Sequence, residues 1–293
     1  MRRACVNFSR HTELVTTVSP VTSLGDLVQA GGVVVLTGAG CSTASGIPDY
    51  RGPNGAFTRG HKPMTFQQFL RDPAGRRRYW ARGHVGWVRF SQAKPNAAHL
   101  ALAELERTGL VIGVITQNVD GLHQAAGSRS IIDLHGRLDR VVCMGCGEQE
   151  SRVSVHERLT AANPHLLIAS KTINPDGDTD IPEELLNEFL MVACLRCAGD
   201  LKPDVVYFGE SVPSERVDRA YDWIDECNTL LVAGSSLTVY SGRRFLTRAH
   251  ALGKSIVIVN AGPTRGEELA DVRIDADVCD VLSGLVEELA QRG

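Results

Sequence analysis

Short, almost continuously apolar runs alternate along the chain with segments of helical periodicity. The runs have the length and composition of buried strands and occupy residues 33–36, 110–115, 229–233 and 255–259. Asn96, a residue type that caps helices, precedes the helical segment 97–107, which ends before Gly109. A second helical segment, residues 241–252, ends before Gly253. Buried strands that alternate with helices predict an α/β fold in which helices cover both faces of a parallel sheet.

Two segments interrupt this alternation. Residues 57–91 are polar and helical in pattern, and Thr65 is placed to cap the first helix there. Residues 141–202 carry four of the eight cysteines and the turn-rich stretch 174–178. We interpret both segments as insertions that pack together as a smaller lobe. The remaining segments, which would form the sheet domain, are residues 20–56, 92–140 and 203–293.

The composition gives no sign of binding to nucleic acid or to an acidic membrane. Hydrophobic residues make up 43%, charged residues 22%, and the net charge is −3. No apolar run approaches the roughly 18 residues that span a bilayer, and residues 1–15 lack the apolar core of a secretory signal. We therefore expect a cytoplasmic protein. Arg2, Arg3 and Arg10 precede the first acidic residue, Glu13, so the mitochondrial matrix is the alternative.

The stretch GAGCSTASGIPDYRG, which starts at Gly38 directly after the first apolar run, partly matches a dinucleotide-binding turn. Such a turn needs a third glycine and an acidic residue about 20 positions later. Gly38 and Gly40 fit, but Thr43 occupies the third position and no acidic residue lies between Asp49 and Asp72. The stretch therefore does not fit a hydride-transferring dehydrogenase. Its backbone still suits a pyrophosphate, and a tight turn without a ligand is the alternative.

The second half of this stretch adds charged residues on a loop that proline stiffens. Asp49 and Arg51 follow Pro48 and are placed to orient a polar ring and a phosphate. A solvated ion pair between them is the alternative. We interpret Cys41, inside the turn, as a small buried residue, with a reactive thiol as the alternative.

Paired cysteines give a specific metal signal. Cys143 with Cys146, and Cys194 with Cys197, form two CxxC pairs, each spaced for half of a tetrahedral zinc site. Four thiolates leave no open position for water or substrate, so the predicted zinc is structural. Two disulfides are the alternative, and they would require an oxidising compartment.

Polar side chains follow the predicted strands where parallel sheets bind ligands. Asn118 and Asp120 come shortly after the run 110–115, and His135 stands before a glycine ahead of the first CxxC pair. We interpret His135 as a general base near neutral pH, with a structural histidine as the alternative.

Seven motifs in sequence order resemble the sirtuins, the NAD-dependent protein deacylases, over residues 33–280. They are GAGCSTASGIPDYRG, TQNVDGLH, LHG, the CxxC pairs, LKPDVVYFGE, AGSSLTVY and IVNAG. GIPDYRG, RYWARGHVGW and the PDGD loop are most similar to class II sirtuins. The resemblance implies a Rossmann-like sheet domain with a smaller zinc-ribbon and helical lobe, and NAD and zinc as cofactors.

The resemblance also implies a reaction that cleaves NAD without redox chemistry. The acyl amide oxygen attacks the nicotinamide ribose, nicotinamide leaves, and the acyl group passes to ADP-ribose. ADP-ribosyl transfer to proteins is a further implied activity. The alternative is that the chain is a catalytically weak regulatory protein that binds NAD or ADP-ribose.

Roles for individual residues follow from the resemblance. His135, Asn118 and Asp120 match the catalytic positions. The positions that match NAD contacts are Gly38, Ala39, Gly40, Ser42, Gly46, Ile47, Asp49, Tyr50, Arg51, Gln117, Asn118, Val119, Asp120, Gly234, Ser235, Ser236, Asn260, Ala261, Gly262 and Cys279. Residues 205–209 match the segment that pairs with an extended acyl-lysine peptide. Tyr79 and Arg82 have the spacing with which some sirtuins recognise acidic acyl groups, and core residues are the alternative.

Overall fold

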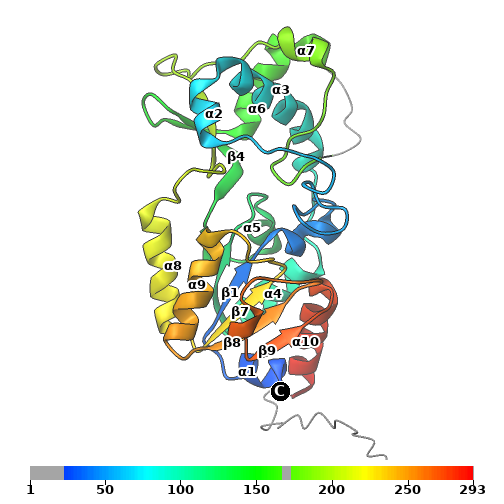
Figure 1. Ribbon diagram of the computed structural model, residues 1–293, viewed down its shortest axis with the longest axis vertical. Coiled ribbons are helices and arrows are strands. Elements are labelled where there is room, and N and C mark those ends of the chain that lie inside the picture. Colours follow the sequence, from blue (N-terminus) through cyan, green and yellow to red (C-terminus); the bar gives the residue numbers. More distant parts are fainter. Residues whose placement is uncertain (1–22, 167–172, 293) are drawn as a thin grey trace, which may run out of the picture.

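A six-stranded parallel sheet forms the centre of the larger lobe in the computed structural model, which describes residues 23–166 and 173–292 (Figure 1). The strand order is β3-β2-β1-β7-β8-β9. The strands are β1 (Val33–Thr37), β2 (Val111–Thr116), β3 (Ile131–Asp133), β7 (Thr229–Ala233), β8 (Ser255–Val259) and β9 (Val272–Ile274). The predicted α/β fold with a parallel sheet is therefore confirmed, and the four predicted strands are its central members.

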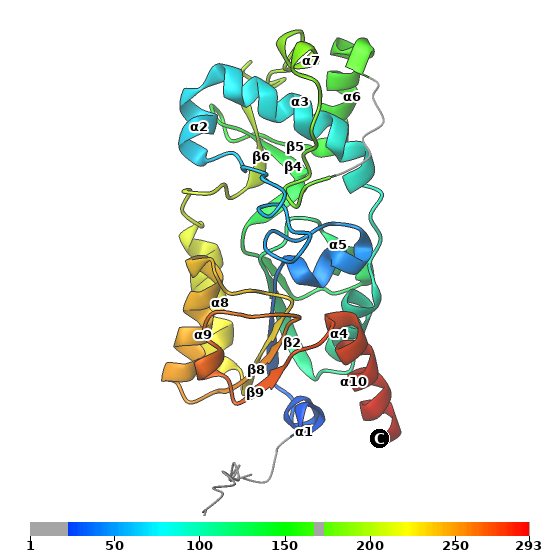
Figure 2. The same cartoon turned by 45° about the vertical axis from the view of Figure 1, so that its right-hand side comes forward.

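Helices cover both faces of this sheet because its central strands are apolar on both sides. Val33 and Val35 of β1 pack into one core with α1 (Leu24–Gln29), α4 (Ala97–Arg107) and α10 (Val278–Arg292). Val34 and Leu36 point to the other face, where α8 (Ser214–Glu226) and α9 (Tyr240–Ala251) lie. Figure 2 shows the two helix layers on opposite sides of the strands. Alternate residues of one strand thus belong to two separate cores.

The two predicted helix caps, Thr65 and Asn96, are confirmed. The Asn96 side chain accepts hydrogen bonds from the backbone N–H of Ala98, at 3.0 Å, and of His99 at the start of α4. Thr65 accepts from Gln68 N–H at the start of α2. Each cap satisfies backbone donors that the first helical turn leaves without a partner.

The smaller lobe contains a three-stranded antiparallel sheet and helices from both predicted insertions (Figure 1). Phe69 and Trp80 from the first insertion share one buried core with Leu159 from the second. The elements are α2 (Phe66–Arg71), α3 (Pro73–Phe90), β4 (Gly136–Cys143), β5 (Gln149–Ser151), α6 (Arg152–Ala162), α7 (Glu183–Asn187) and β6 (Leu201–Val205). β4 and β6 run across the predicted boundaries at 140/141 and 202/203, and the division into segments stays a prediction.

Four short elements lie between the helices and strands described above. They are η1 (Ala39–Ser45), α5 (Leu122–Ala126), η2 (Pro164–Leu166) and η3 (Glu267–Leu269). Arg2, Arg3, Arg10 and Glu13, on which the alternative location rested, lie outside the described residues, as do residues 20–22 of the predicted sheet domain. Within the described ranges, each helix is too short or too polar to cross a membrane.

Helix α3 and the 174–178 turn approach so closely that Gly86 leaves no room for a side chain. A Cβ at Gly86 would overlap the carbonyl oxygen of Gly177, whereas a Cβ at Gly83 of the same helix would meet Arg152 Nη2 at 3.4 Å, an ordinary contact. The approach joins the two insertions, and Arg82 Nε reinforces it with a 2.9 Å hydrogen bond to Asp178.

We expect Gly86→Ala to lower the free energy of unfolding by about 1–3 kcal/mol, because the added methyl group must push the turn away from the helix. Gly83→Ala is the matched control and should be neutral or stabilise the protein by up to about 1 kcal/mol, since alanine favours helix. Urea denaturation of both variants tests this. Equal losses for the two substitutions would contradict the packing argument.

Candidate active site

A cavity of about 1180 Å³ opens at the carboxyl ends of the parallel strands. Its walls come from the loops after β1, β2, β7 and β8, from the start of α9 and from residues 206–212. Every residue predicted to contact NAD or to act in catalysis lines this cavity, except Gly46 and Cys279. The structure thus brings together residues that lie more than 200 positions apart in the sequence.

The glycine turn lies directly against the loop that follows β7. Gly40 N–H donates to the Gly234 carbonyl oxygen at 2.9 Å, and a Cβ at Gly40 would stand 2.9 Å from the same oxygen. A Cβ at Gly38 would stand 2.8 Å from Ser235 Cβ. Two of the glycines that suggested a phosphate-binding turn are therefore also required by the packing of two backbone segments.

A hydrogen-bond network joins the turn after β1 to the loop after β2. Asn118 Nδ2 donates to the Gly38 carbonyl oxygen at 3.0 Å and to Ser42 Oγ at 3.1 Å. Ser42 Oγ in turn donates to Asp120 Oδ2 at 2.7 Å. Burial raises the pKa of Asp120, and the N–H of Leu122 and the Ser42 hydroxyl oppose that shift. The network fixes the two predicted catalytic residues of this loop relative to the turn.

His135 is held in one orientation by both of its ring nitrogens. Nδ1 lies 2.9 Å from the Gln117 carbonyl oxygen, so Nδ1 carries the hydrogen. Nε2 lies 2.8 Å from Ser241 Oγ and is therefore the acceptor of the hydroxyl hydrogen. Burial lowers the pKa of His135 to about 4, against the opposing effect of the Gln117 hydrogen bond. The imidazole is neutral at neutral pH and offers Nε2 as a proton acceptor, although it titrates below an ordinary histidine.

The loop residues Asp49 and Arg51 do not pair with each other. Asp49 Oδ1 accepts from Gly52 N–H at 2.7 Å, and the Arg51 guanidinium lies 4.9 Å from the centre of the Phe57 ring. Among the described residues, Arg51 has no carboxylate partner within salt-bridge distance. Arg51 lines the cavity, so its positive charge is available to an anionic ligand.

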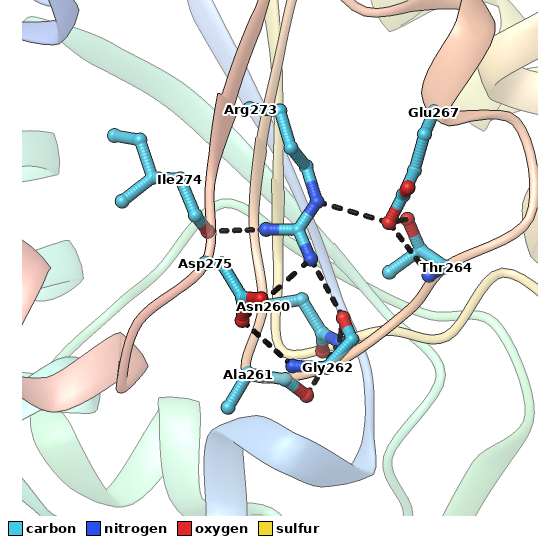
Figure 3. A network of polar contacts seen from close by, with 8 residues as sticks. All are labelled: Asn260, Ala261, Gly262, Thr264, Glu267, Arg273, Ile274 and Asp275. Carbon is cyan, nitrogen blue, oxygen red and sulfur yellow. Dashed lines mark hydrogen bonds and ion pairs between the residues drawn. The ribbon is translucent and has the colours of Figure 1, made fainter.

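Sequence reasoning missed several residues of the cavity wall. Ser241, Arg244 and Arg265 line it. Figure 3 shows a further group that holds the 260–264 loop in place: Arg273 Nη2 donates to the Gly262 carbonyl oxygen at 2.6 Å, and its Nε donates to Glu267. Apolar periodicity gives no signal for such residues, because they are polar and their role depends on contacts between elements that lie apart in the sequence.

The contacts of Tyr79 and Arg82 favour the core alternative over recognition of an acidic acyl group. Tyr79 is buried and packs edge-on against Phe69, at 5.6 Å between ring centres, as the core alternative predicted. Arg82 pairs with Asp178 at 2.9 Å and with Asp180 at 2.7 Å. Both residues line a separate, smaller cavity of about 370 Å³. Local sequence spacing could not show that the guanidinium already has two carboxylate partners.

The four cysteines of the CxxC pairs converge in the smaller lobe. Cys143 Sγ lies 3.4 Å from Cys197 Sγ, and Cys146 Sγ lies 3.8 Å from Cys194 Sγ. All four sulfurs lie within 4.8 Å of one another, and none of the four forms a disulfide. A tetrahedron of Zn–S bonds of about 2.3 Å places sulfurs about 3.8 Å apart. The convergence of all four sulfurs on one point fits Zn²⁺ and favours a metal site over two disulfides.

Comparison with known proteins adds independent findings. A model of the Sir2 family matches residues 38–241. NAD-dependent protein deacetylase 1 of Streptomyces coelicolor is 47% identical over 290 residues, which cover 99% of this chain and 97% of the relative. NAD-dependent protein deacetylase 1 of Mycobacterium avium is 54% identical over 88% of this chain and 92% of its own.

Solved structures of Sir2 proteins share the fold. A Sir2 complex with a p53 peptide and NAD+ is 32% identical, has a TM-score of 0.72, and covers 91% of this chain and 97% of its own. A Sir2 complex with a deacetylated p53 peptide and 3′-O-acetyl ADP-ribose has a TM-score of 0.73 at 32% identity, covering 90% and 96% of the two chains.

We expect about one zinc ion per chain after dialysis into metal-free buffer, because four thiolates bind a single tetrahedral ion. Removal of this zinc by a chelator should unfold the smaller lobe, since the ion joins the ends of β4 and β6. Hydrogen exchange should then rise in β4, β6 and α6 and stay slow in β1, β7 and β8. Cys146→Ser should lose zinc, and Cys227→Ser, at a buried cysteine outside the cluster, should keep it. A metal-free chain with native exchange throughout would contradict this.

Because several histidines are buried, we expect the free energy of unfolding to fall in mild acid. Burial lowers the pKa of His84 and of His135 to about 4, below the ordinary value of 6.5. Between these values the unfolded chain binds protons that the native chain does not, so the free energy of unfolding falls as the pH drops below 6.5. Urea denaturation between about pH 7 and pH 5 measures the slope.

The variant His84→Gln should make this slope shallower, because one titrating group is removed. Zinc content is measured at each pH, so that loss of the metal is recognised separately. An unchanged slope in His84→Gln would show that His84 does not contribute to the acid sensitivity.

Proposed function

The chain belongs to the Sir2 family, and on this premise we propose that it is an NAD-dependent protein-lysine deacylase. It cleaves NAD to nicotinamide and transfers the acyl group of a modified lysine to ADP-ribose. One observation carries the proposal: a neutral His135 with an accepting Nε2 faces the same cavity as the Asn118–Ser42–Asp120 network and the glycine turn. Assignment to the class II branch, ADP-ribosyl transfer and a cytoplasmic location without nucleic-acid partners stay predictions.

His135 is the proposed general base. NAD, when bound, supplies the glycosidic bond that breaks and the ribose that receives the acyl group. The Gln117 carbonyl oxygen holds the hydrogen on Nδ1 and so keeps the Nε2 lone pair directed to the cavity. Ser241, which now donates to Nε2, occupies the position where a substrate hydroxyl would donate its proton. Burial keeps His135 deprotonated at neutral pH, so that Nε2 can accept a proton there.

The cofactor-facing residues divide the cavity into two parts in this proposal. Asn118 and Asp120, fixed by Ser42, stand at the nicotinamide end. The loops 234–236 and 260–262 follow β7 and β8 and would hold the adenosine end. Arg51, whose charge has no carboxylate partner in the described residues, is placed to meet the pyrophosphate.

The acyl-lysine protein would bind as an extended peptide along residues 206–209. This segment is already part of a strand-like arrangement, since Phe66 N–H donates to the Phe208 carbonyl oxygen at 3.0 Å and Thr65 forms a parallel bridge with Phe208. Val206 N–H donates to the His135 carbonyl oxygen at 2.8 Å, so the segment lies beside the proposed base. Pairing through the backbone recognises the extended form of a peptide rather than one side chain.

Incubation with NAD and a panel of acyl-lysine peptides tests the proposal, with mass spectrometry scoring both deacylation and ADP-ribosylation. We expect deacylation with release of nicotinamide and no absorbance of reduced nicotinamide. His135→Ala should lower the rate about 10²–10⁴-fold, because the proton acceptor is lost, and leave NAD affinity within a few-fold. His250→Ala, at an exposed histidine of α9, is the control and should keep full activity.

Unchanged nicotinamide release in His135→Ala would refute the assigned base. NAD binding without deacylation of any peptide would favour a regulatory protein.

A further inference from the structure

Three buried side chains with metal-binding chemistry meet behind the glycine turn. Cys41 comes from η1, His99 from α4 and His123 from α5, and each is at most 1% exposed. The Cys41 sulfur and one ring nitrogen of each histidine all lie within 4.8 Å of one another. The two imidazole rings are 4.8 Å apart between centres. The proposed reaction uses none of these side chains.

The surroundings of His99 leave one ring nitrogen for a ligand. Its Nδ1 lies 2.9 Å from Asn96 Oδ1, which is placed to accept an Nδ1 hydrogen, and the Asn96 backbone nitrogen lies farther from the same Nδ1, at 3.3 Å. Nε2 has only a long contact, 3.5 Å, to Ser42 Oγ. Metal-binding histidines are commonly oriented in this way, with the far nitrogen donating to an oxygen and the near nitrogen free for the metal.

His123 has an unsatisfied ring nitrogen. Nε2 lies 3.0 Å from Thr37 Oγ1, and the Thr37 hydroxyl donates to Thr116 Oγ1 at 2.8 Å. Thr37 therefore accepts from Nε2–H, which leaves a bare lone pair on Nδ1. This nitrogen is buried and has no hydrogen-bond partner within the described part of the chain. A buried acceptor without a partner is costly, and a metal ion would satisfy it.

The donor set selects the kind of ion. One thiolate and two imidazoles suit Zn²⁺ or another thiophilic divalent cation, whereas Mg²⁺ and Ca²⁺ require oxygen ligands. On binding, the metal–sulfur bond forms, the S–H bond of Cys41 breaks and the proton passes to solvent. Asp120 hydrogen-bonds to Ser42, the neighbour of Cys41, and its carboxylate offsets the remaining positive charge.

We propose that Cys41, His99 and His123 form a second metal site for a thiophilic divalent cation, and that its occupancy inhibits the enzyme. To bind one ion, the ligand atoms must approach to less than about 4 Å from one another. That contraction displaces η1, which carries both Cys41 and Ser42, and so disturbs the hydrogen bonds of Ser42 to Asn118 and Asp120. The inhibitory effect rests on the proposed function, whereas the binding of the ion does not.

Zinc titration of the protein that already carries one zinc ion tests the site itself. Calorimetry and elemental analysis should find a second zinc per chain in the wild type and none in Cys41→Ala. Cys227→Ala is the matched control, because Cys227 is equally buried but lies outside the cluster, and it should bind the second ion. Thermal melting verifies that both variants fold, and Cys41→Val replaces Cys41→Ala if the smaller residue destabilises the core. A wild type that takes up only one zinc, or a Cys41 variant that takes up two, overturns the proposal.

Deacetylation measured over the same range of free zinc tests the consequence. Wild type and Cys227→Ala should lose activity as the second site fills, and Cys41→Ala should need at least about ten-fold more zinc for the same loss. Binding of the second zinc without loss of activity overturns the inhibitory role. Absence of deacylation of every peptide in the acyl-lysine panel before zinc is added refutes the proposed function, and the binding titration still decides the metal site.

Discussion

The arrangement of the active site depends on the contact between two backbone segments at the carboxyl ends of β1 and β7. Gly40 donates to the Gly234 carbonyl oxygen, and neither residue leaves space for a Cβ. The contact places the glycine turn beside residues 234–236, so both parts of the proposed NAD site share one wall. It also positions Ser42 to bridge Asn118 and Asp120 on the neighbouring loop. A side chain at either glycine would separate the loops and with them the two parts of the cavity.

The two lobes are coupled because single strands of the smaller lobe connect the zinc cluster to the cavity. β4 begins directly after His135 and ends at Cys143, a predicted zinc ligand. Its partner β6 begins at Leu201, opposite Cys143, and leads into the segment proposed to bind the peptide. The cluster lies outside the cavity wall, yet it stands at the far ends of the strands that adjoin the proposed base and the proposed peptide-binding backbone. A structural zinc ion would therefore act on the proposed reaction through the position of two antiparallel strands.

The sequence predicted the central strands and the polar residues at their ends, because buried parallel strands are continuous apolar runs and their loops carry the chemistry. It did not predict β9, which is three residues long and too short to show a period. It also missed α8, although the buried residues Val217, Ala220 and Ile224 have the spacing of an amphipathic helix. Partners such as Ser241 for His135, or Asp178 for Arg82, depend on tertiary contacts that no local pattern encodes.

The charges around the cavity indicate how the site is completed. Burial lowers the pKa of His135 and raises the pKa of Asp120. It therefore disfavours both the protonated imidazolium and the ionised carboxylate. Arg51, by contrast, keeps a positive charge that no carboxylate in the described chain neutralises. A pyrophosphate would supply a counter-charge for Arg51, which lines the cavity where NAD is proposed to bind.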